Sequence, residues 1–435
     1  MRLMTRTGML TLLTACVVGK LLLAAEPAPN TLTPQEQAIA QPQPNQPLHA
    51  LAFDSIHMIG RQNGWAQNAQ AVLLTNDWVF NDKAIWRTTN GGQFWAQVLT
   101  ASPAETGNIS AFFRDSKRAW VAVAAESTNV TIFRTSDGGV SWSRSQLRQS
   151  HNIQDSCLSF TGTDQGWLML IPDHGMNSSP GDLYRTGDGG AHWLRVNSTA
   201  ASPHGWIWEE AALPEFDKRH PYLVCGGAIA FRNDSTGWVR GSLASTTPRF
   251  LFITRDGGLN WQVQHLSLPA SLHAGWMEPI GLPRFFRRDS HEGILPAQYQ
   301  PTNSESASFA TVIYRTHDGG FSWQPSTPVK FDGLWSFITA RKGWMWTPES
   351  HGTGSTAPVK GTLYRTDDGG VSWKPAGTGK ALEQFLTRGE DIVQLDFVDG
   401  AYGWAIARDR HNLTQLLHTT DGGETWSVIP TKVHP

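Results

Sequence analysis

An eight-residue motif that occurs seven times constrains the fold of this chain more than any other feature. Each copy, called a box here, reads T-x-D-G-G-x-x-W, except that Asn90 replaces the aspartate in the first copy. The boxes run over residues 88–95, 135–142, 186–193, 254–261, 316–323, 366–373 and 419–426. A motif that returns about every 50 residues indicates a repeat architecture, in which each unit buries its core only by stacking on its neighbours.

The chemistry of a box predicts a stapled turn. A carboxylate can accept hydrogen bonds from nearby backbone N–H groups, and the two glycines supply positive φ without steric cost. The tryptophan opens the next strand and can bury a large apolar area between neighbouring sheets. None of this requires a ligand, so we expect a structural role for Asn90, Asp137, Asp188, Asp256, Asp318, Asp368 and Asp421.

A second motif, F-x-x-x-x-x-G-W, precedes most boxes and completes the repeat. Clear copies run over residues 160–167, 231–238, 337–344 and 397–404, and Phe286 with Gly293-Ile294 marks a degenerate copy in the fifth unit. The two motifs therefore predict four short strands in each repeat, with the box between strands three and four. The fold class follows: an all-β, seven-bladed β-propeller of four-stranded antiparallel blades.

The box resembles the Asp-box, or BNR, repeat of sialidases, sortilin and xyloglucanases. With the upstream Gly-Trp and with Tyr-Arg before the box threonine, the pattern is most similar to the photosystem II stability/assembly factor family of seven-bladed propellers, over about residues 51–430. That resemblance implies a non-catalytic propeller whose arginines contact chlorophyll-protein partners. The arginines before the box threonines are instead expected to bond to the next box at the blade rim; they are Arg87, Arg134, Arg185, Arg315 and Arg365.

The N-terminal sequence predicts that the protein is exported. Arg2 and Arg6 precede an apolar run that ends on small residues near Ala25, so residues 1–25 are interpreted as a cleaved signal peptide. A retained anchor, or a lipoprotein modified at Cys16, are the alternatives. Residues 26–50 are a Pro/Gln-rich linker, residues 51–430 the propeller and residues 431–435 a tail. The protein is expected to be periplasmic or extracellular.

Composition and motif spacing disfavour several function classes. The net charge of −2 and the absence of like-charge blocks give no reason to expect nucleic-acid binding. No H-E-x-x-H or G-x-S-x-G motif occurs, and the histidines show no metal-ligand spacing. We expect no cofactor and no metal, a monomer, and membrane contact only through an N-terminal anchor or lipid.

The candidate binding surface is the face opposite the boxes. In an antiparallel meander the turns between strands two and three, and between blades, lie on that face, and here they are long. We call it the long-loop face. Once the repeat motifs and the strands account for the other tryptophans, Trp78, Trp206, Trp208, Trp276 and Trp346 remain, and all map to this face or its edge. Glu209 and Glu210 follow Trp206 and Trp208, and Glu278 follows Trp276.

Two functions remain open. The first is an exported, non-catalytic protein-binding scaffold in the manner of an assembly or stability factor, with the surplus tryptophans as binding residues. The second is a glycan-binding or glycoside-hydrolysing propeller, in which tryptophans stack on sugar and two of the nearby carboxylates form an acid–base pair. Against a sialidase, no Arg-Ile-Pro segment opens the propeller, and xyloglucanases use two propellers where this chain has one.

Overall fold

The computed structural model describes fifteen stretches of the chain. They are residues 53–68, 84–100, 108–124, 128–150, 152–172, 181–198, 222–223, 229–242, 250–286, 290–301, 310–329, 333–349, 360–386, 390–409 and 414–434. The predicted residues 1–25 and 26–50 lie outside them. In the described part, no helix has the length and apolar character needed to cross a membrane.

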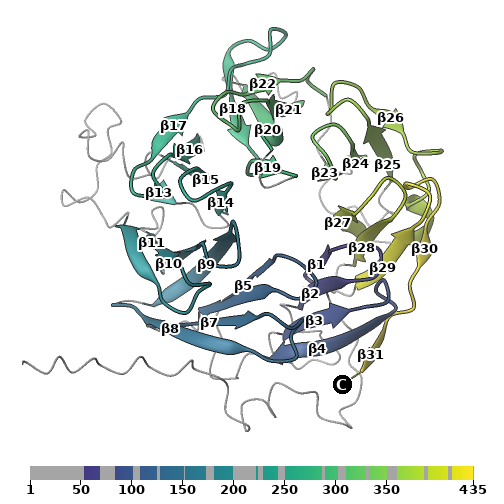
Figure 1. Ribbon diagram of the computed structural model, residues 1–435. Helices are drawn as coiled ribbons and strands as arrows, with labels where there is room; N and C mark the ends of the chain where they lie inside the picture. Colours follow the sequence, from purple (N-terminus) through teal and green to yellow (C-terminus); the bar gives the residue numbers. More distant parts are fainter. Residues whose placement is uncertain are drawn as a thin grey trace, which may run out of the picture.

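Seven antiparallel sheets form a closed ring (Figure 1), which confirms the predicted seven-bladed β-propeller. Blades one to three comprise β1 Ser55–Met58, β2 Gly64–Asn68, β3 Ala84–Thr88 and β4 Phe94–Thr100; β5 Asn108–Phe113, β6 Ala119–Ala124, β7 Asn129–Thr135 and β8 Ser143–Arg148; and β9 Ile153–Phe160, β10 Gly166–Pro172, β11 Asp182–Thr186 and β12 Leu194–Ser198. Blade four comprises β13 Tyr222–Leu223, β14 Ile229–Phe231, β15 Gly237–Ser242, β16 Phe250–Thr254 and β17 Gln262–Gln264.

The remaining blades follow the same order of strands. Blade five comprises β18 Gly275–Pro279, β19 Arg284–Phe285, β20 Gly293–Pro301, β21 Ala310–Thr316 and β22 Gln324–Pro325. Blades six and seven comprise β23 Leu334–Phe337, β24 Gly343–Pro348, β25 Gly361–Thr366 and β26 Lys374–Pro375; and β27 Asp391–Phe397, β28 Gly403–Arg408, β29 Thr414–Thr419 and β30 Ser427–Val428. Among the described residues, a short 3-10 helix, η4 Glu383–Phe385, follows β26.

The first strand of each blade lies nearest the axis of the ring (Figure 1). In blades four and five this inner strand is divided, because β13 and β14 both pair with β15, and β18 and β19 both pair with β20. The prediction that Phe286 holds the aromatic position of the second motif in blade five is wrong. Phe285, and not Phe286, stands opposite Gly293 as Phe160 stands opposite Gly166, because the segment joining β19 to β20 is longer than its counterparts.

Indole rings join neighbouring blades. Trp167 of blade three stacks on Phe231 of blade four, with ring centroids 3.7 Å apart, and its Nε1 donates to the carbonyl oxygen of Gly257 in the box of blade four. The equivalent tryptophans of blades two, six and seven (Trp120, which follows Ala119, and Trp344 and Trp404) donate in the same way to the next box, at Gly189, Gly422 and Gly91. The core thus consists of apolar layers between blades, as a repeat architecture requires.

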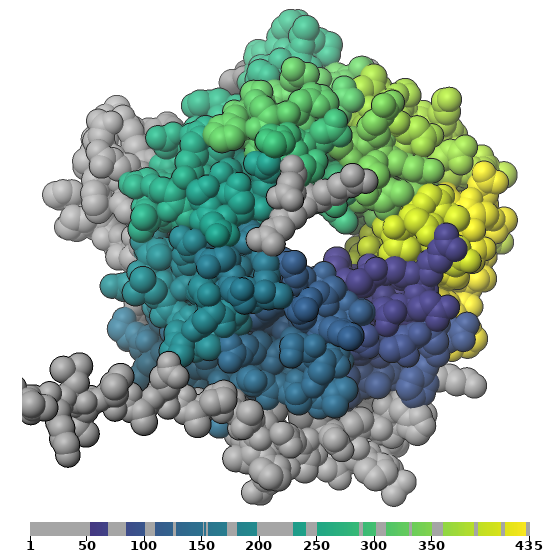
Figure 2. Space-filling model, viewed as in Figure 1, coloured from purple at the N-terminus to yellow at the C-terminus, as the bar shows by residue number. Residues whose placement is uncertain are grey.

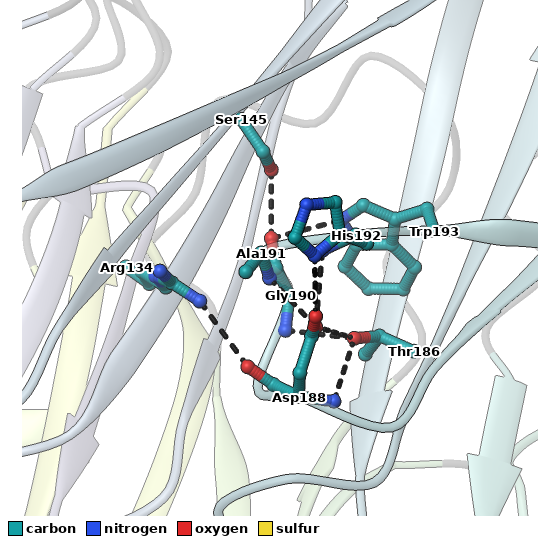
Figure 3. A network of polar contacts seen from close by, with 8 residues as sticks. All are labelled: Arg134, Ser145, Thr186, Asp188, Gly190, Ala191, His192 and Trp193. Carbon is teal, nitrogen blue, oxygen red and sulfur yellow. Dashed lines mark hydrogen bonds and ion pairs between the residues drawn. The ribbon is translucent and has the colours of Figure 1, made fainter. Parts of the chain in front are cut away.

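Each box is a turn closed by its own side chains, between strands three and four of its blade. Figure 3 shows the box of blade three. In blade three, Thr186 Oγ1 donates to Asp188 Oδ1 at 2.8 Å and accepts from the Gly190 N–H at 2.9 Å. Gly189 has φ of 73°, and a Cβ there would lie 2.8 Å from the Thr163 carbonyl oxygen, so a glycine is required.

The C-terminal segment adds a strand to the first blade. Residues 431–435 were predicted as a tail, but β31 Lys432–His434 pairs in parallel with β4, with Lys432 opposite Phe94. Blade one therefore holds five strands, four from the N-terminal part of the propeller and one from its C-terminal end. This pairing, together with the contacts between blades seven and one, closes the ring.

Candidate functional site: the long-loop face and the central channel

The box carboxylates bond within their own turns. Asp188 Oδ1 accepts from the backbone N–H groups of Ala191 and His192, and its Oδ2 lies 2.6 Å from the His192 ring. Partial burial alone would raise the pKa of Asp188, but the hydrogen bonds from His192 and Thr186 outweigh it and lower the pKa to about 2. Such a carboxylate is ionised and already engaged, which fits a structural role.

The other boxes repeat these bonds. Asp318 and Asp368 also have a pKa of about 2, because hydrogen bonds from the following serine and the preceding threonine outweigh partial burial. Hydrogen bonds also lower the pKa of Asp137, Asp256 and Asp421. Asn90 keeps the Oδ1 part of the pattern, since it accepts from Thr88 Oγ1 and from the Phe94 N–H.

The arginines before the box threonines lie at the seams between blades. Arg134 donates to the Asp188 carbonyl oxygen, and Arg315 to that of Asp368, each in the box of the next blade. The predicted bond to the next box is therefore confirmed for these two, and Arg365 also reaches the next box, where its Nη1 lies 3.6 Å from the Glu424 carboxylate. Arg185 donates within its own blade to Gln165, and Arg87 to Asn63.

Trp276 and Glu278 lie on the long-loop face. Both belong to β18, where Trp276 stands opposite Gln300 and Glu278 opposite Gln298, at the end of β20 remote from the turn that joins β19 to β20. They share one side of the strand because side chains alternate. Both are half-buried, and the Trp276 indole nitrogen has no hydrogen-bond partner among the described residues.

The segment before β18 is held tightly against its blade. The Tyr299 hydroxyl donates to the His273 carbonyl oxygen at 2.5 Å, and the Tyr314 hydroxyl donates to that of Ser267 at 2.5 Å. Ala274 has φ of 57°, a left-handed conformation that costs energy for a residue with a Cβ. The chain therefore enters β18 in a fixed conformation, which fixes the position of Trp276.

The predicted role of Trp346 as a binding residue is wrong. It has no solvent-exposed surface and lies in the core between blades six and seven. The strand β24 extends past Gly343-Trp344 to Pro348, and Trp346 falls on the same side as Trp344. A fully buried indole cannot contact a ligand on the surface. The predicted binding residues Trp78, Trp206, Trp208, Glu209 and Glu210 lie outside the described residues.

The inner strands also surround a central channel, which Figure 2 shows as an opening through the ring. The residue just before the inner-strand aromatic (Met58 in blade one) occupies equivalent places around it. These residues are His57, Phe112, Ser159, Ala230, Arg284, Ser336 and Asp396. Three of them cap the next blade: Ser159 accepts from the Phe231 N–H, Ser336 from the Phe397 N–H and Asp396 from the Met58 N–H.

The charged members of this set influence one another across the channel. Burial raises the pKa of Asp396 to about 7, although the Met58 N–H and the charge of Arg284 act to lower it. Burial, and then the charge of Arg284, lower the pKa of His57 to about 4. Burial also lowers the pKa of Arg284, against the charge of Asp396. His57 and Arg284 still reach the solvent of the channel.

A cavity of about 620 Å³ opens at the box-side mouth of the channel, lined by the ends of the inner strands of blades two to five. Its walls include Phe112, Phe286 and three arginines, Arg114, Arg232 and Arg284. Sequence reasoning missed this site, because only an alignment of the inner strands places Arg284 at a position where two other blades carry serine. No group of three potential metal ligands occurs among the described residues.

Comparisons with known proteins agree with this architecture at the level of the repeat. The model of the Sortilin-Vps10 family, described as sortilin, neurotensin receptor 3, matches residues 83–225, less than half of the chain. This match supports the Asp-box type of repeat and does not support the resemblance to photosystem II assembly factors. No curated protein sequence matches the chain.

Similar solved structures are remote in sequence. A GH74 xyloglucanase from Xanthomonas campestris is 13% identical with a TM-score of 0.35, over 85% of this chain and 64% of that one. A PL25 ulvan lyase is 10% identical with a TM-score of 0.48, over 88% and 97% of the two chains. The fucose-specific lectin from Aleuria aurantia is 10% identical with a TM-score of 0.39, over 88% and 96%. The chain thus spans less than two thirds of the xyloglucanase.

Proposed function

We propose that this protein is an exported, non-catalytic propeller that binds a protein partner on its long-loop face. The observation that carries the proposal is the fixed edge formed by Trp276 and Glu278. A half-buried tryptophan beside a polar side chain on a rigid strand suits a protein-binding hot spot, because little conformational entropy is lost when a partner covers it. The boxes on the opposite face support a scaffold role, since their carboxylates are engaged within the turns.

The finer hypothesis is an assembly or stability factor, which is the role that the resemblance to photosystem II assembly factors implies. Such a factor holds a partner through a broad surface and carries out no bond-breaking step. Identification of captured proteins by mass spectrometry tests it, since chlorophyll-binding proteins are the expected partners. Other partners would leave the protein-binding proposal intact and remove this version of it.

A capture experiment tests the binding face. The protein would be immobilised and exposed to the exported fraction of its source cells, as wild type, as Trp276→Ala and as Phe321→Ala. Phe321 is a matched control, because it is an exposed aromatic residue in the same blade at the box corner on the opposite face. We expect Trp276→Ala to reduce capture at least about tenfold, as for a hot-spot residue, and Phe321→Ala to preserve it. Equal capture by both variants would place the partner elsewhere.

A glycan is the second candidate, and the pairing of Trp276 with Glu278 on one side of β18 favours it. An indole face can stack on a sugar ring, and a carboxylate beside it can accept bonds from hydroxyl groups. A panel of fluorogenic glycosides and a glycan array separate the two functions. Turnover that is abolished in Glu278→Gln would establish a hydrolase, and array binding lost in Trp276→Ala would establish a lectin.

Export is tested by fractionation. The full chain and a variant lacking residues 1–25 would be expressed in the same host, and the protein located in each. We expect the full chain outside the cytoplasm, shortened near Ala25, and the truncated variant inside it. A full chain that stays with the membrane at its full length would indicate the anchor.

A further inference from the structure

The box-side mouth of the central channel contains an arginine whose side chain has no hydrogen bond and no ion pair with the described residues. This residue is Arg284, on the inner strand of blade five; its guanidinium lies 5.5 Å from the centre of the Phe286 ring and is influenced by the charge of Asp396 across the channel. At the equivalent places, Ser159, Ser336 and Asp396 each cap the next blade. A guanidinium has only donors and cannot form such a cap, so Arg284 does not serve ring closure in that way.

The walls around Arg284 combine positive charge with aromatic surface. Arg232 is engaged, since its Nε donates to the Ser290 carbonyl oxygen and its guanidinium lies over the Phe285 ring. Asp115, the one carboxylate in the lining, is bound by Arg118 at 2.9 Å and by two backbone N–H groups. Arg114, the third arginine of the lining, lies 4.0 Å from the Asp115 carboxylate. Arg284 is therefore the arginine of the lining whose guanidinium has neither a hydrogen bond nor an ion pair with the described residues, and the rings of Phe112 and Phe286 line the same cavity.

From this arrangement we infer that the box-side mouth of the channel binds a carboxylate carried on an apolar body, with the Arg284 guanidinium as its anchor and the phenylalanine rings as its walls. The planar fork of a guanidinium matches a carboxylate in a two-point interaction. Because burial of charge beside apolar rings costs free energy, a singly charged carboxylate on an apolar body is favoured over a doubly charged phosphate. The cavity of about 620 Å³ has room for a group of this size.

The inference goes beyond the proposed function, because this mouth lies on the face opposite Trp276. The carboxylate has two sources, a free aromatic acid or an acidic side chain of a polypeptide. Both offer the same chemistry to Arg284, and the experiment below distinguishes them.

The experiment follows the arginine Nε–Hε resonances of the full protein labelled with 15N-arginine. The probe is 3-phenylpropanoate, and 3-phenylpropan-1-ol is its uncharged control. We expect the Arg284 signal, assigned by its loss in Arg284→Gln, to move with the acid, to reach saturation and to stay in place with the alcohol. No movement, or equal movement with both compounds, would overturn the inference.

Variants test the anchor. Arg284→Gln should bind the probe at least about tenfold more weakly, which corresponds to about 1.4 kcal/mol. Arg284→Lys should fall between the two, because it keeps the charge and loses the fork. Arg255→Gln is the matched control: Arg255 is an exposed arginine over the Phe321 ring at the box rim, and binding should be unchanged there. Equal affinity of Arg284→Gln and wild type would contradict the anchor role, and the titration of the wild-type resonance decides the matter if Arg284→Gln does not fold.

A second titration separates the two sources of the carboxylate. A capped Phe-Glu-Phe peptide would be compared with its Phe-Gln-Phe counterpart at the same resonance. Binding of the glutamate peptide alone indicates an acidic side chain of a partner, and binding of the free acid alone indicates a small molecule. Either result supports a carboxylate site, and a failure of both probes refutes it.

Discussion

The indole nitrogen of Trp344 in blade six donates a hydrogen bond of 2.8 Å to the carbonyl oxygen of Gly422 in blade seven. The same ring stacks on Phe397 of blade seven, with centroids 3.8 Å apart. One side chain thus fixes two elements of the next blade, the box and the inner strand. In blade five Ile294 occupies the equivalent place, and there the seam to blade six is closed by the packing of Ile294 and Ile313 on Phe337 and by the Arg315 bond to the next box.

Replacement of Trp344 by phenylalanine tests this link. Trp344→Phe removes the donor, leaves the Gly422 carbonyl oxygen without its partner and opens a small void. We expect a loss of about 2–3 kcal/mol in the free energy of unfolding. Trp373→Phe is the control, because the Trp373 indole nitrogen has no partner among the described residues, and we expect a loss below about 1.5 kcal/mol. Urea denaturation measures both, and equal losses would contradict a special role for the bond.

Asn90 shows what a box requires at its carboxylate position. It retains the bonds to Oδ1 without a charge, so Asp318→Asn should preserve most of the turn. Asp318→Ala removes the acceptor for Thr316 Oγ1 and for the Ser322 N–H. By analogy with the loss of a helix cap, we expect alanine to cost about 1–2 kcal/mol at pH 7 and asparagine less than half of that. A similar cost for both, measured by chemical denaturation, would show that charge and not geometry stabilises the box.

The boxes also predict how stability depends on acid. The pKa of Asp188, Asp318 and Asp368 is about 2 in the folded protein, below the value of about 4 for an unfolded chain. Their stabilising contribution is therefore complete above about pH 4 and is lost as the pH falls toward 2. A variant with asparagine at all three positions should lose less stability between pH 4 and 2 than the wild type. Thermal melts at several pH values measure this difference. If the melting temperatures of the variant and the wild type fell in parallel between pH 4 and 2, this account would be contradicted.

The last strand of the ring can be removed without touching a box. A chain that ends at Thr431 lacks β31 and leaves the outer edge of β4 unpaired. We expect a loss on the order of 1–3 kcal/mol, since the parallel pairing of a short strand contributes a few hydrogen bonds. Removal of Pro435 alone is the control and should have no effect. A melting temperature unchanged by the longer deletion would show that the contacts between blades seven and one suffice to close the ring.

Repetition explains which features could be predicted from the sequence. The box and the Gly-Trp motif recur with fixed spacing, so the number of blades and the turn position followed directly from them. Trp346 was assigned wrongly because the length of β24 depends on its pairing with β25, as far as Pro348 opposite Gly361, and no local signal marks that end. The channel escaped notice for a different reason. Its residues, such as Ser159, Arg284 and Asp396, share a place in the ring and no residue type.

Asp396 and His57 should oppose each other in the pH dependence of stability. The pKa of Asp396 is raised to about 7 in the folded protein, mainly by burial, so its contribution falls as the pH rises from about 4 to 7. The pKa of His57 is lowered to about 4 by burial and by Arg284, so its contribution rises from about pH 4 to 6.5. Asp396→Asn, which keeps an oxygen for the Met58 N–H, should therefore gain stability relative to the wild type as the pH rises through this range. His57→Gln should lose stability relative to the wild type over the same range. In the double variant neither group titrates, so its stability should change little across this range. Thermal melts at half-unit steps of pH measure the three curves, and curves that stay parallel to the wild type would show that neither group titrates in the channel as described.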